Sequence, residues 1–209
     1  MSTEVIAIDG PAGSGKSSVA RALASALGWS FLDTGAMYRA VTVEALRRGV
    51  DVEDAPAMGE LAAALTLTTL PRVSVDGRDV EDAIRTDEVN LAVSIVAANP
   101  LVRAQMVRRQ REFAAAQPLG TVVEGRDITT VVFPNATVKI YLTATLEERA
   151  RRRGDEGEAS VARRDDADTT RSASPLRQAG DALVLDTTGR TVVDVVEEII
   201  ECLKLKTSS

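Results

Sequence analysis

The chain has 209 residues, 44% of them hydrophobic and 27% charged, which is the composition of an ordinary globular protein with one sizeable core. Its formal net charge is −6, so diffuse binding to nucleic acid or to an anionic membrane is not expected. The absence of histidine excludes imidazole acid–base chemistry and histidine-ligated metals. Cys202 is the single cysteine, which excludes an internal disulfide.

The sequence predicts no signal peptide and no membrane span. The apolar run at residues 5–8 is too short for either and leads directly into a glycine-rich loop. No other stretch approaches the length of a membrane-spanning helix. We therefore expect a cytoplasmic protein.

The N-terminal part predicts the beginning of a doubly wound α/β domain. The expected elements alternate in the order strand 4–9, glycine-rich loop 10–17, helix 18–27, strand 30–32 and helix 35–48. Gly28 and Gly49 are expected to end the two helices, and Thr34 is the expected N-cap of the second.

The middle of the chain differs in composition. Residues 65–80 are rich in Thr and Val and contain the turn-forming pair Asp76-Gly77, which predicts a β-hairpin or small meander. Residues 81–98 then become helical, and we interpret this block as an inserted lobe. Asn99-Pro100 predicts the start of a helix that runs to about Ala116, with Asn as the cap and Pro at the first position.

The C-terminal half predicts a return to the α/β pattern. The expected elements are strand 121–123, strand 137–142, helix 145–153, strand 183–185 and an amphipathic helix at 192–203. Thr145 and Glu148 are expected to form a capping box. Residues 154–168 are polar without an apolar period and are expected to be mobile. The last helix has no sustained heptads, so we expect a monomer.

The segment Gly10-x4-Gly15-Lys16-Ser17 matches the Walker A pattern in full. Its glycines let successive backbone N–H groups face one anion, and the following helix N-terminus adds a partial positive charge. Lys16 can reach the β- and γ-phosphates of ATP, and the Ser17 hydroxyl can ligate Mg²⁺. The alternative is a glycine turn beside an exposed lysine. The residues predicted to bind ATP here are Gly10, Pro11, Ala12, Gly13, Ser14, Gly15, Lys16, Ser17 and Ser18.

A P-loop alone fits GTPases, ATPases, motors and small-molecule kinases. The Asn-Lys-x-Asp type motif of guanine-specific GTPases does not occur, since the lysines after Lys16 are only Lys139, Lys204 and Lys206. Arginines with nearby acids are abundant instead. Phosphoryl transfer between two nucleotides needs such arginines, because both substrates are anionic and electrostatic stabilisation supplies most of the catalysis. No strong general base is required, which agrees with the absence of histidine.

The chain resembles the bacterial cytidylate kinases from its first strand to its last helix. The matching segments are IDGPAGSGKS at 8–17, LDTGAMYR at 32–39, IRT at 84–86, VEGRDITTVVFPNATVKIYL at 123–142, RRDDADTTR at 163–171 and SPL at 174–176. The GRD…TVVFP run is the most specific of them. The resemblance implies Mg²⁺-assisted transfer of the ATP γ-phosphate to CMP or dCMP.

The resemblance also implies the architecture: an α/β fold with a P-loop and a parallel five-stranded sheet flanked by helices. Its parts are a core at about 1–59, 99–148 and 172–209, an inserted monophosphate-binding lobe at about 60–98, and a lid at about 149–171.

The residues implied to read cytosine are Ser94, Arg103 and Asp127. The chemistry agrees, because a carboxylate accepts a hydrogen bond from the N4 amino group and Arg donates to the ring acceptors. Uracil presents an acceptor where cytosine has N4, so Asp127 would repel it. The alternative for Arg126-Asp127 is a structural ion pair at a strand end.

The resemblance assigns further residues to the phosphates and the ribose. The acceptor-side residues are Thr34 near the nucleotide, Arg39 and Arg126 on the CMP phosphate, Arg164 and Asp168 on the ribose side, and Arg171 facing the transferred phosphate. From the arginine run at 149–153, Arg151 and Arg153 are expected to touch ATP. For any single arginine the alternative is a solvated surface side chain.

Charge stabilisation during transfer is assigned to Lys16, Arg126, Arg153 and Arg171. The expected cofactor is Mg²⁺ with ATP. Ser17 is its expected ligand, and Glu124 or Asp33 is expected to hold it through water.

Only nine residues, GDEGEASVA, separate Arg153 from Arg163, whereas the resemblance implies a longer, helical lid. A short lid excludes water less well, so we predict that ATP hydrolysis competes with transfer. The measurement is ADP release without CMP, compared with the CMP-driven rate. A negligible ratio of the two would contradict the prediction.

Two alternatives stay open. The first is a kinase for another small acceptor, such as UMP, AMP or shikimate. The second is an ATP-binding regulatory module without turnover. Such a module would be expected to lack the acceptor-side arginines, yet Arg39, Arg126 and Arg171 are all present.

Overall fold

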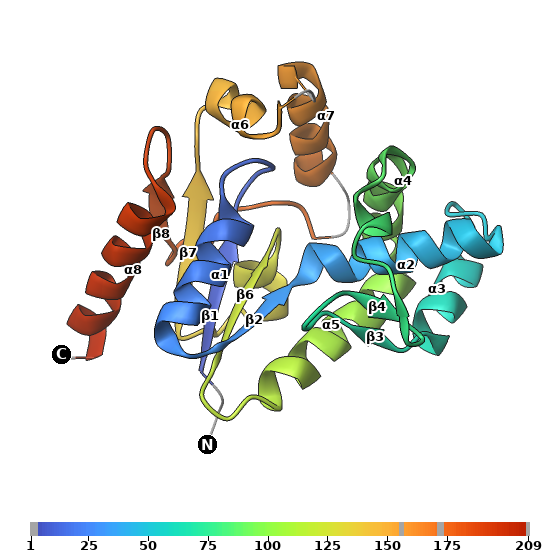
Figure 1. The fold of residues 1–209 in the computed structure, drawn as a ribbon, viewed down its shortest axis with the longest axis horizontal. Helices are drawn as coiled ribbons and strands as arrows, with labels where there is room; N and C mark the ends of the chain where they lie inside the picture. Colours follow the sequence, from blue (N-terminus) through green and yellow to red (C-terminus); the bar gives the residue numbers. More distant parts are fainter. Residues whose placement is uncertain (1–3, 155–156, 171–173, 208–209) are drawn as a thin grey trace. The chain divides into compact units, whose positions relative to one another are not determined.

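A computed structural model of the chain describes residues 4–154, 157–170 and 174–207 (Figure 1). Its internal contacts divide it into two compact units. The first unit comprises Met1–Leu32, Ala114–Thr170 and Pro175–Ser209, and the second comprises Asp33–Phe113 with Arg171–Ser174. The predicted boundary of the inserted lobe at about residue 60 lies inside a helix of the second unit.

The first unit is built on a five-stranded sheet with the strand order β2-β6-β1-β7-β8. The strands are β1 Val5–Asp9, β2 Ser30–Asp33, β6 Thr121–Gly125, β7 Val138–Thr143 and β8 Leu183–Asp186. β1 is central and pairs in parallel with both β6 and β7, and β8 pairs in parallel with β7. All five residues of β1 are buried, which explains its unbroken apolar sequence before Asp9. The predicted α/β fold is confirmed.

Two helices cover one face of this sheet, α1 Lys16–Leu27 and α8 Val192–Thr207 (Figure 1). Leu23 of α1 and Ile199 of α8 lie in one core cluster with Ile6, Ile140 and Leu142 of the sheet. The core is aliphatic, as the 3% aromatic content requires. The unit also contains the π-helical turn η2 Ile128–Val132, the helices α6 Leu146–Arg152 and α7 Gly157–Thr170, and the last residues of α5 Pro100–Ala115.

The second unit combines helices with a small antiparallel sheet. Its elements are α2 Thr34–Arg48, α3 Ala55–Ala64, β3 Leu67–Thr68, β4 Ser74–Val75, β5 Arg78–Asp79, the 3₁₀ turn η1 Ala83–Arg85, α4 Asp87–Ala98 and most of α5. The buried carboxylate of Glu44 on α2 forms ion pairs with Arg47, Arg48 and Arg78. Because Arg78 belongs to β5, this cluster ties the small sheet to α2.

Local signals correctly predicted the turn of this hairpin and the start of α5. Asp76 and Gly77 have φ angles of 50° and 78°, so both adopt the left-handed conformation that tight hairpins favour. Asn99 caps α5, and its Oδ1 accepts hydrogen bonds from the backbone N–H groups of Leu101 at 2.9 Å and Val102 at 3.3 Å.

Two predicted helix caps differ from the structure. α2 is capped by Asp33 rather than by Thr34, because the Asp33 Oδ1 accepts from the Ala36 N–H at 2.9 Å. Thr145 does cap α6 through the Glu148 N–H, at 3.3 Å. The reciprocal half of the capping box is wrong, since the Glu148 carboxylate pairs with Arg151 and Arg152 instead.

Residues 154–168 were expected to be mobile and no helix was predicted there, but α7 occupies most of this segment. This helix has hardly any apolar face of its own, although Val161 is fully buried among its described side chains. Acidic side chains of α7 instead bind arginines of other elements. The sequence prediction also omitted α3, although Asp54 caps it by accepting from the Ala57 N–H at 3.0 Å.

Among the described residues, no helix combines the length and the apolar character that crossing a membrane requires.

Candidate functional site

The carboxyl ends of the parallel strands lie at one edge of the sheet, where open α/β folds bind their ligands. The phosphate loop follows β1, Arg126 and Asp127 follow β6, and α6 follows β7. Thr187 follows β8 at the same edge. The first unit therefore gathers groups from four strand ends around the loop.

The glycines of the loop are required by its packing. Gly13 has a φ of 78°, and a Cβ at this position would lie 2.7 Å from the Arg149 carbonyl oxygen. A Cβ on Gly10 would lie 2.1 Å from the Leu142 carbonyl oxygen. Since real Cβ atoms do not approach backbone oxygens so closely, α6 and the end of β7 hold the loop tightly.

Lys16 and Ser17 both form hydrogen bonds at the phosphate loop. The Lys16 side chain is buried, and its Nζ donates a hydrogen bond to the Pro11 carbonyl oxygen at 2.7 Å. The Ser17 hydroxyl donates to Glu124 Oε1 at 2.6 Å. Burial, followed by the nearby charge of Arg126, holds the pKa of Lys16 well below its usual range. A phosphate bound beside this amine would restore the charged form.

Arg126 forms the basic centre of the strand end next to the loop. Its Nε donates to Asp168 Oδ2 at 2.6 Å. Burial opposes its charged form, but attraction to Asp168 and to Glu124 outweighs burial and raises the pKa of Arg126. The guanidinium therefore stays charged in a shielded site. Two predicted acceptor-side residues, Arg126 and Asp168, are thus in direct contact.

Asp9 fixes the segment that carries Arg126 and Asp127, a role that the sequence analysis missed. Its buried carboxylate accepts from the Ile128 N–H at 2.9 Å, the Thr129 N–H at 2.8 Å and the Thr129 hydroxyl at 2.6 Å. These bonds anchor the beginning of η2 directly after Asp127, whose side chain is buried.

Arg149 and Arg152, spaced three residues apart on α6, contact the phosphate loop. Arg149 donates from Nη1 to the Ala12 carbonyl oxygen and from Nε to that of Ala144, both at 3.1 Å. Arg152 donates from Nη1 to the Gly13 carbonyl oxygen at 3.5 Å. Neither residue was among the predicted site residues, although their helical spacing places both on one face.

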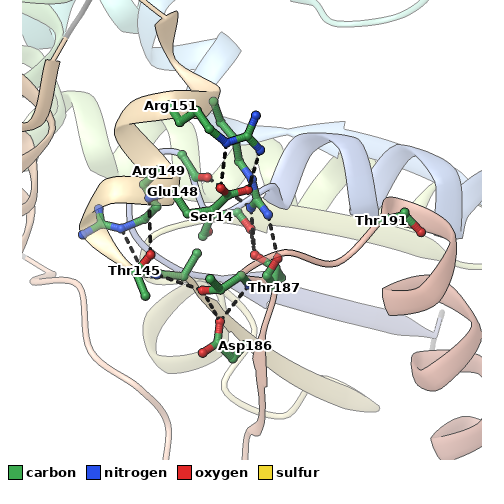
Figure 2. Close-up of polar contacts among 12 residues, drawn as sticks. Ser14, Thr145, Glu148, Arg149, Arg151, Asp186, Thr187 and Thr191 are labelled. Atoms are coloured by element: carbon green, nitrogen blue, oxygen red, sulfur yellow. Dashed lines mark hydrogen bonds and ion pairs between the residues drawn. The ribbon is translucent and has the colours of Figure 1, made fainter.

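Arg151 and Arg153, the two arginines of the run at 149–153 that were predicted to touch ATP, have other surroundings. Figure 2 shows Arg151 facing Glu148, to which it donates two hydrogen bonds of 2.8 Å, and its side chain is 71% exposed. Arg153 is half-buried at the C-cap of α6.

Thr187 connects the loop to β7 and α6 (Figure 2). Its hydroxyl lies 3.1 Å from the carbonyl oxygens of both Ser14 and Thr143, and it accepts from Arg152 Nη1 at 2.8 Å. Thr187 is only 2% exposed, so these bonds are shielded from water.

Thr187→Val is expected to weaken ATP binding by about five- to tenfold, because an isosteric methyl replaces a buried hydroxyl that supports the loop at Ser14. Calorimetric titration with ATP measures the effect. Thr188→Val is the control, since the Thr188 hydroxyl bonds Asp186 and the Thr145 N–H rather than the loop. Equal affinities of the two variants would contradict the prediction.

Three further predicted acceptor residues, Arg39, Ser94 and Arg103, lie in the second unit. Arg39 donates from Nη1 to the Ile84 carbonyl oxygen and to Asn90 Oδ1, both at 2.8 Å. The Arg103 guanidinium lies 5.9 Å from the centre of the Tyr38 ring, within cation–π range, and donates to the Ala97 carbonyl oxygen at 3.3 Å. Ser94 is half-buried on α4.

Several predicted residues are not brought together within one unit. Thr34 and Asp33 begin α2 of the second unit, whereas Ser17, Glu124 and Asp127 belong to the first. Arg171 and the side chain of Arg164 lie outside the described residues. Among the side chains that the structure does describe, no three Cys, Asp or Glu residues form a group able to hold a metal by themselves.

Residues 6–205 match the model of the cytidylate kinase family. The chain belongs to this family. The cytidylate kinase of Mycobacterium avium is 48% identical to it over 96% of this chain and 95% of the relative. That of Geobacillus kaustophilus is also 48% identical, over 94% of both chains. The resemblance seen in the sequence motifs is thereby confirmed.

One similar protein has a name that combines two activities. A bifunctional pantoate ligase/cytidylate kinase of Synechocystis is 46% identical over 96% of this chain and 42% of its own length.

Among solved structures, a Thermus thermophilus protein superposes with a TM-score of 0.54 at 18% identity, covering 99% of this chain and 98% of that one. At that identity the likeness supports the fold alone.

Proposed function

We propose that this protein transfers the γ-phosphoryl group of ATP to CMP or dCMP, giving ADP and CDP or dCDP. One observation carries the proposal beyond family membership. Arg126 of the neighbouring strand end lies close enough to Lys16 of the phosphate loop to lower its pKa, and the charges of Glu124 and Asp168 act on both basic groups. A phosphate donor and an anionic acceptor both need such a centre.

On the ATP side, the backbone N–H groups of the loop and Lys16 are proposed to hold the β- and γ-phosphates. Ser17 and Glu124 fit a magnesium site, since Mg²⁺ binds one or two protein oxygens together with phosphate oxygens and water. A bound magnesium ion neutralises negative charge on the phosphates. Asp33 stays the alternative to Glu124 as the acid that would hold magnesium.

On the acceptor side, Arg39 and Arg126 are proposed to hold the CMP phosphate, with Thr34 nearby. Asp168 and Arg164 are assigned to the ribose. We propose that cytosine is recognised by Ser94, Arg103 and Asp127. The Asp127 carboxylate would accept from the N4 amino group, and Arg103 would donate to the N3 and O2 acceptors. These assignments rest on family motifs and on the burial of Asp127 and Arg103.

The transfer step needs positioning and charge stabilisation rather than a strong base. Lys16, Arg126, Arg153 and Arg171 are proposed to offset the charge that spreads over the transferred group, with Arg151 near the ATP. We further propose a cytoplasmic monomer that acts on free nucleotides, without nucleic-acid or membrane partners; the net charge of −6 supports this.

A coupled ADP assay over CMP, dCMP, UMP, AMP and shikimate tests the proposal. CMP and dCMP are expected to give the highest kcat/KM. A higher value for another acceptor would assign a different kinase activity. ADP release that no acceptor increases would favour a regulatory ATP-binding module.

A further inference from the structure

Helix α7 directs two carboxylates, one turn apart, at basic groups of the site. Asp168 pairs with Arg126, and Asp165 pairs with Arg149 of α6. The first pair joins residues already assigned to the acceptor side. The second pair involves no predicted site residue, yet it lies directly against the phosphate loop.

Asp165 and Arg149 together hold both backbone groups of Ala12. Asp165 Oδ1 accepts a hydrogen bond from the Ala12 N–H at 3.3 Å, while its Oδ2 accepts from Arg149 Nη1. The same Nη1 donates to the Ala12 carbonyl oxygen at 3.1 Å. The side chains of Arg149 and Asp165 are 10% and 20% exposed, so their attraction is screened less than that of a surface pair.

These contacts fix the two peptide planes on either side of Ala12. One plane carries the Ala12 N–H, and the other carries its carbonyl and the N–H of Gly13. Gly13 has a φ of 78°, a left-handed conformation that glycine adopts more readily than any other residue. A loop that binds phosphate through backbone N–H groups depends on the direction of each one. Holding Ala12 therefore limits the rotation of the peptide planes next to Gly13.

We propose that Asp165 is a positioning residue of the nucleotide site, which sets Arg149 and the first half of the phosphate loop in the geometry that ATP requires. The inference rests on the proposed function for its link to catalysis. Asp165 acts through Arg149 and Ala12 rather than by touching the reacting atoms. It also ties α7 to the loop, so this helix and the loop respond together when nucleotide binds.

Three substitutions of Asp165 separate its charge from its shape. Asp165→Asn keeps the size but leaves one acceptor oxygen for two donors, the Ala12 N–H and Arg149, and Asp165→Ala removes both contacts. Each is expected to raise the Kd of ATP, measured calorimetrically without acceptor, by about tenfold. Asp165→Glu keeps the carboxylate and is expected to recover most of the affinity. The KM of the acceptor is expected to change less than about twofold.

The chain offers a matched control at the next residue. Asp166 lies on the same helix with an exposed side chain, and Asp166→Ala and Asp166→Asn are expected to leave the Kd unchanged. In an Arg149→Met background, Asp165→Ala is expected to cost less than in the wild type, because only its hydrogen bond with the Ala12 N–H remains to be lost. Circular dichroism and thermal unfolding check that each variant folds.

Equal Kd values for the Asp165 and Asp166 variants would overturn the inference. So would an undiminished loss in the Arg149→Met background, or a loss confined to the acceptor KM. ATP binding without acceptor decides the first two outcomes independently of the acceptor's identity. If the wild type binds ATP but phosphorylates neither CMP nor dCMP, the proposed function fails while the comparison of Asp165 with Asp166 still stands.

Discussion

Lys16→Ala is expected to abolish phosphoryl transfer while the protein stays folded. The Lys16 ammonium is the one lysine at the loop, and phosphate charge that develops during transfer would lose its nearest cationic donor. Removing a single such donor in a shielded site lowers kcat on the order of 10²–10³-fold. The coupled ADP assay with saturating CMP measures the loss.

Folding is not expected to depend on this lysine. Burial lowers the pKa of Lys16, so the folded protein holds its proton less tightly than the unfolded chain does. The ionisation of Lys16 therefore opposes folding at any pH below the pKa of the unfolded lysine, and the alanine variant removes this penalty. A change of about 1 kcal/mol in the free energy of unfolding would move the Tm by only ~2–4 °C in a chain of this size.

A charge-conserving variant sharpens the test. Lys16→Arg keeps the positive charge but replaces a compact ammonium with a planar group that the loop does not fit, so it is expected to be nearly as inactive. Substantial activity in either variant, with ATP still bound, would remove Lys16 from the transfer step.

The fold of the first unit could be predicted because its signals are local. Buried strands such as β1 are continuous apolar runs, here up to Asp9. The glycine spacing of the phosphate loop predicts the conformation of that loop. α7 could not be predicted this way. Its residues are mostly polar, and the helix forms ion pairs of Asp165 and Asp168 with arginines that come from other elements.

The same distinction between local signals and long-range contacts applies to the residues of the site. Gly10 to Ser17 form one contiguous motif, so the sequence alone located the nucleotide loop. The supporting residues contact it across long separations: Arg149 lies 137 residues from Ala12, and Thr187 lies 173 residues from Ser14. Asp9 bonds Ile128 across 119 residues. Only the register of the parallel sheet brings these side chains to one edge, and no local pattern encodes that register.

The choice between Asp33 and Thr34 as the cap of α2 shows a finer limit. Both residue types cap helices well, and propensity alone does not separate adjacent candidates. In the structure Asp33 has the extended backbone that a cap needs, whereas Thr34 is buried and already helical.

Asp127→Ala is expected to reduce the preference for CMP over UMP by more than about tenfold, because a carboxylate that accepts from the cytosine N4 amino group also repels the uracil O4. The side chain is only 5% exposed, so water does not screen this discrimination strongly. The measurement is the ratio of kcat/KM for the two acceptors. Most of the change is expected as a loss of CMP efficiency, with UMP constant or improved.

Asp127→Asn distinguishes base recognition from a structural role for the same carboxylate. The amide can turn its NH₂ group toward the uracil O4, so UMP efficiency is expected to rise above that of the alanine variant. A structural ion pair would behave differently: both variants would lower the Tm, and the CMP-to-UMP ratio would keep its wild-type value. An unchanged ratio in two folded variants would therefore assign cytosine recognition to residues other than Asp127.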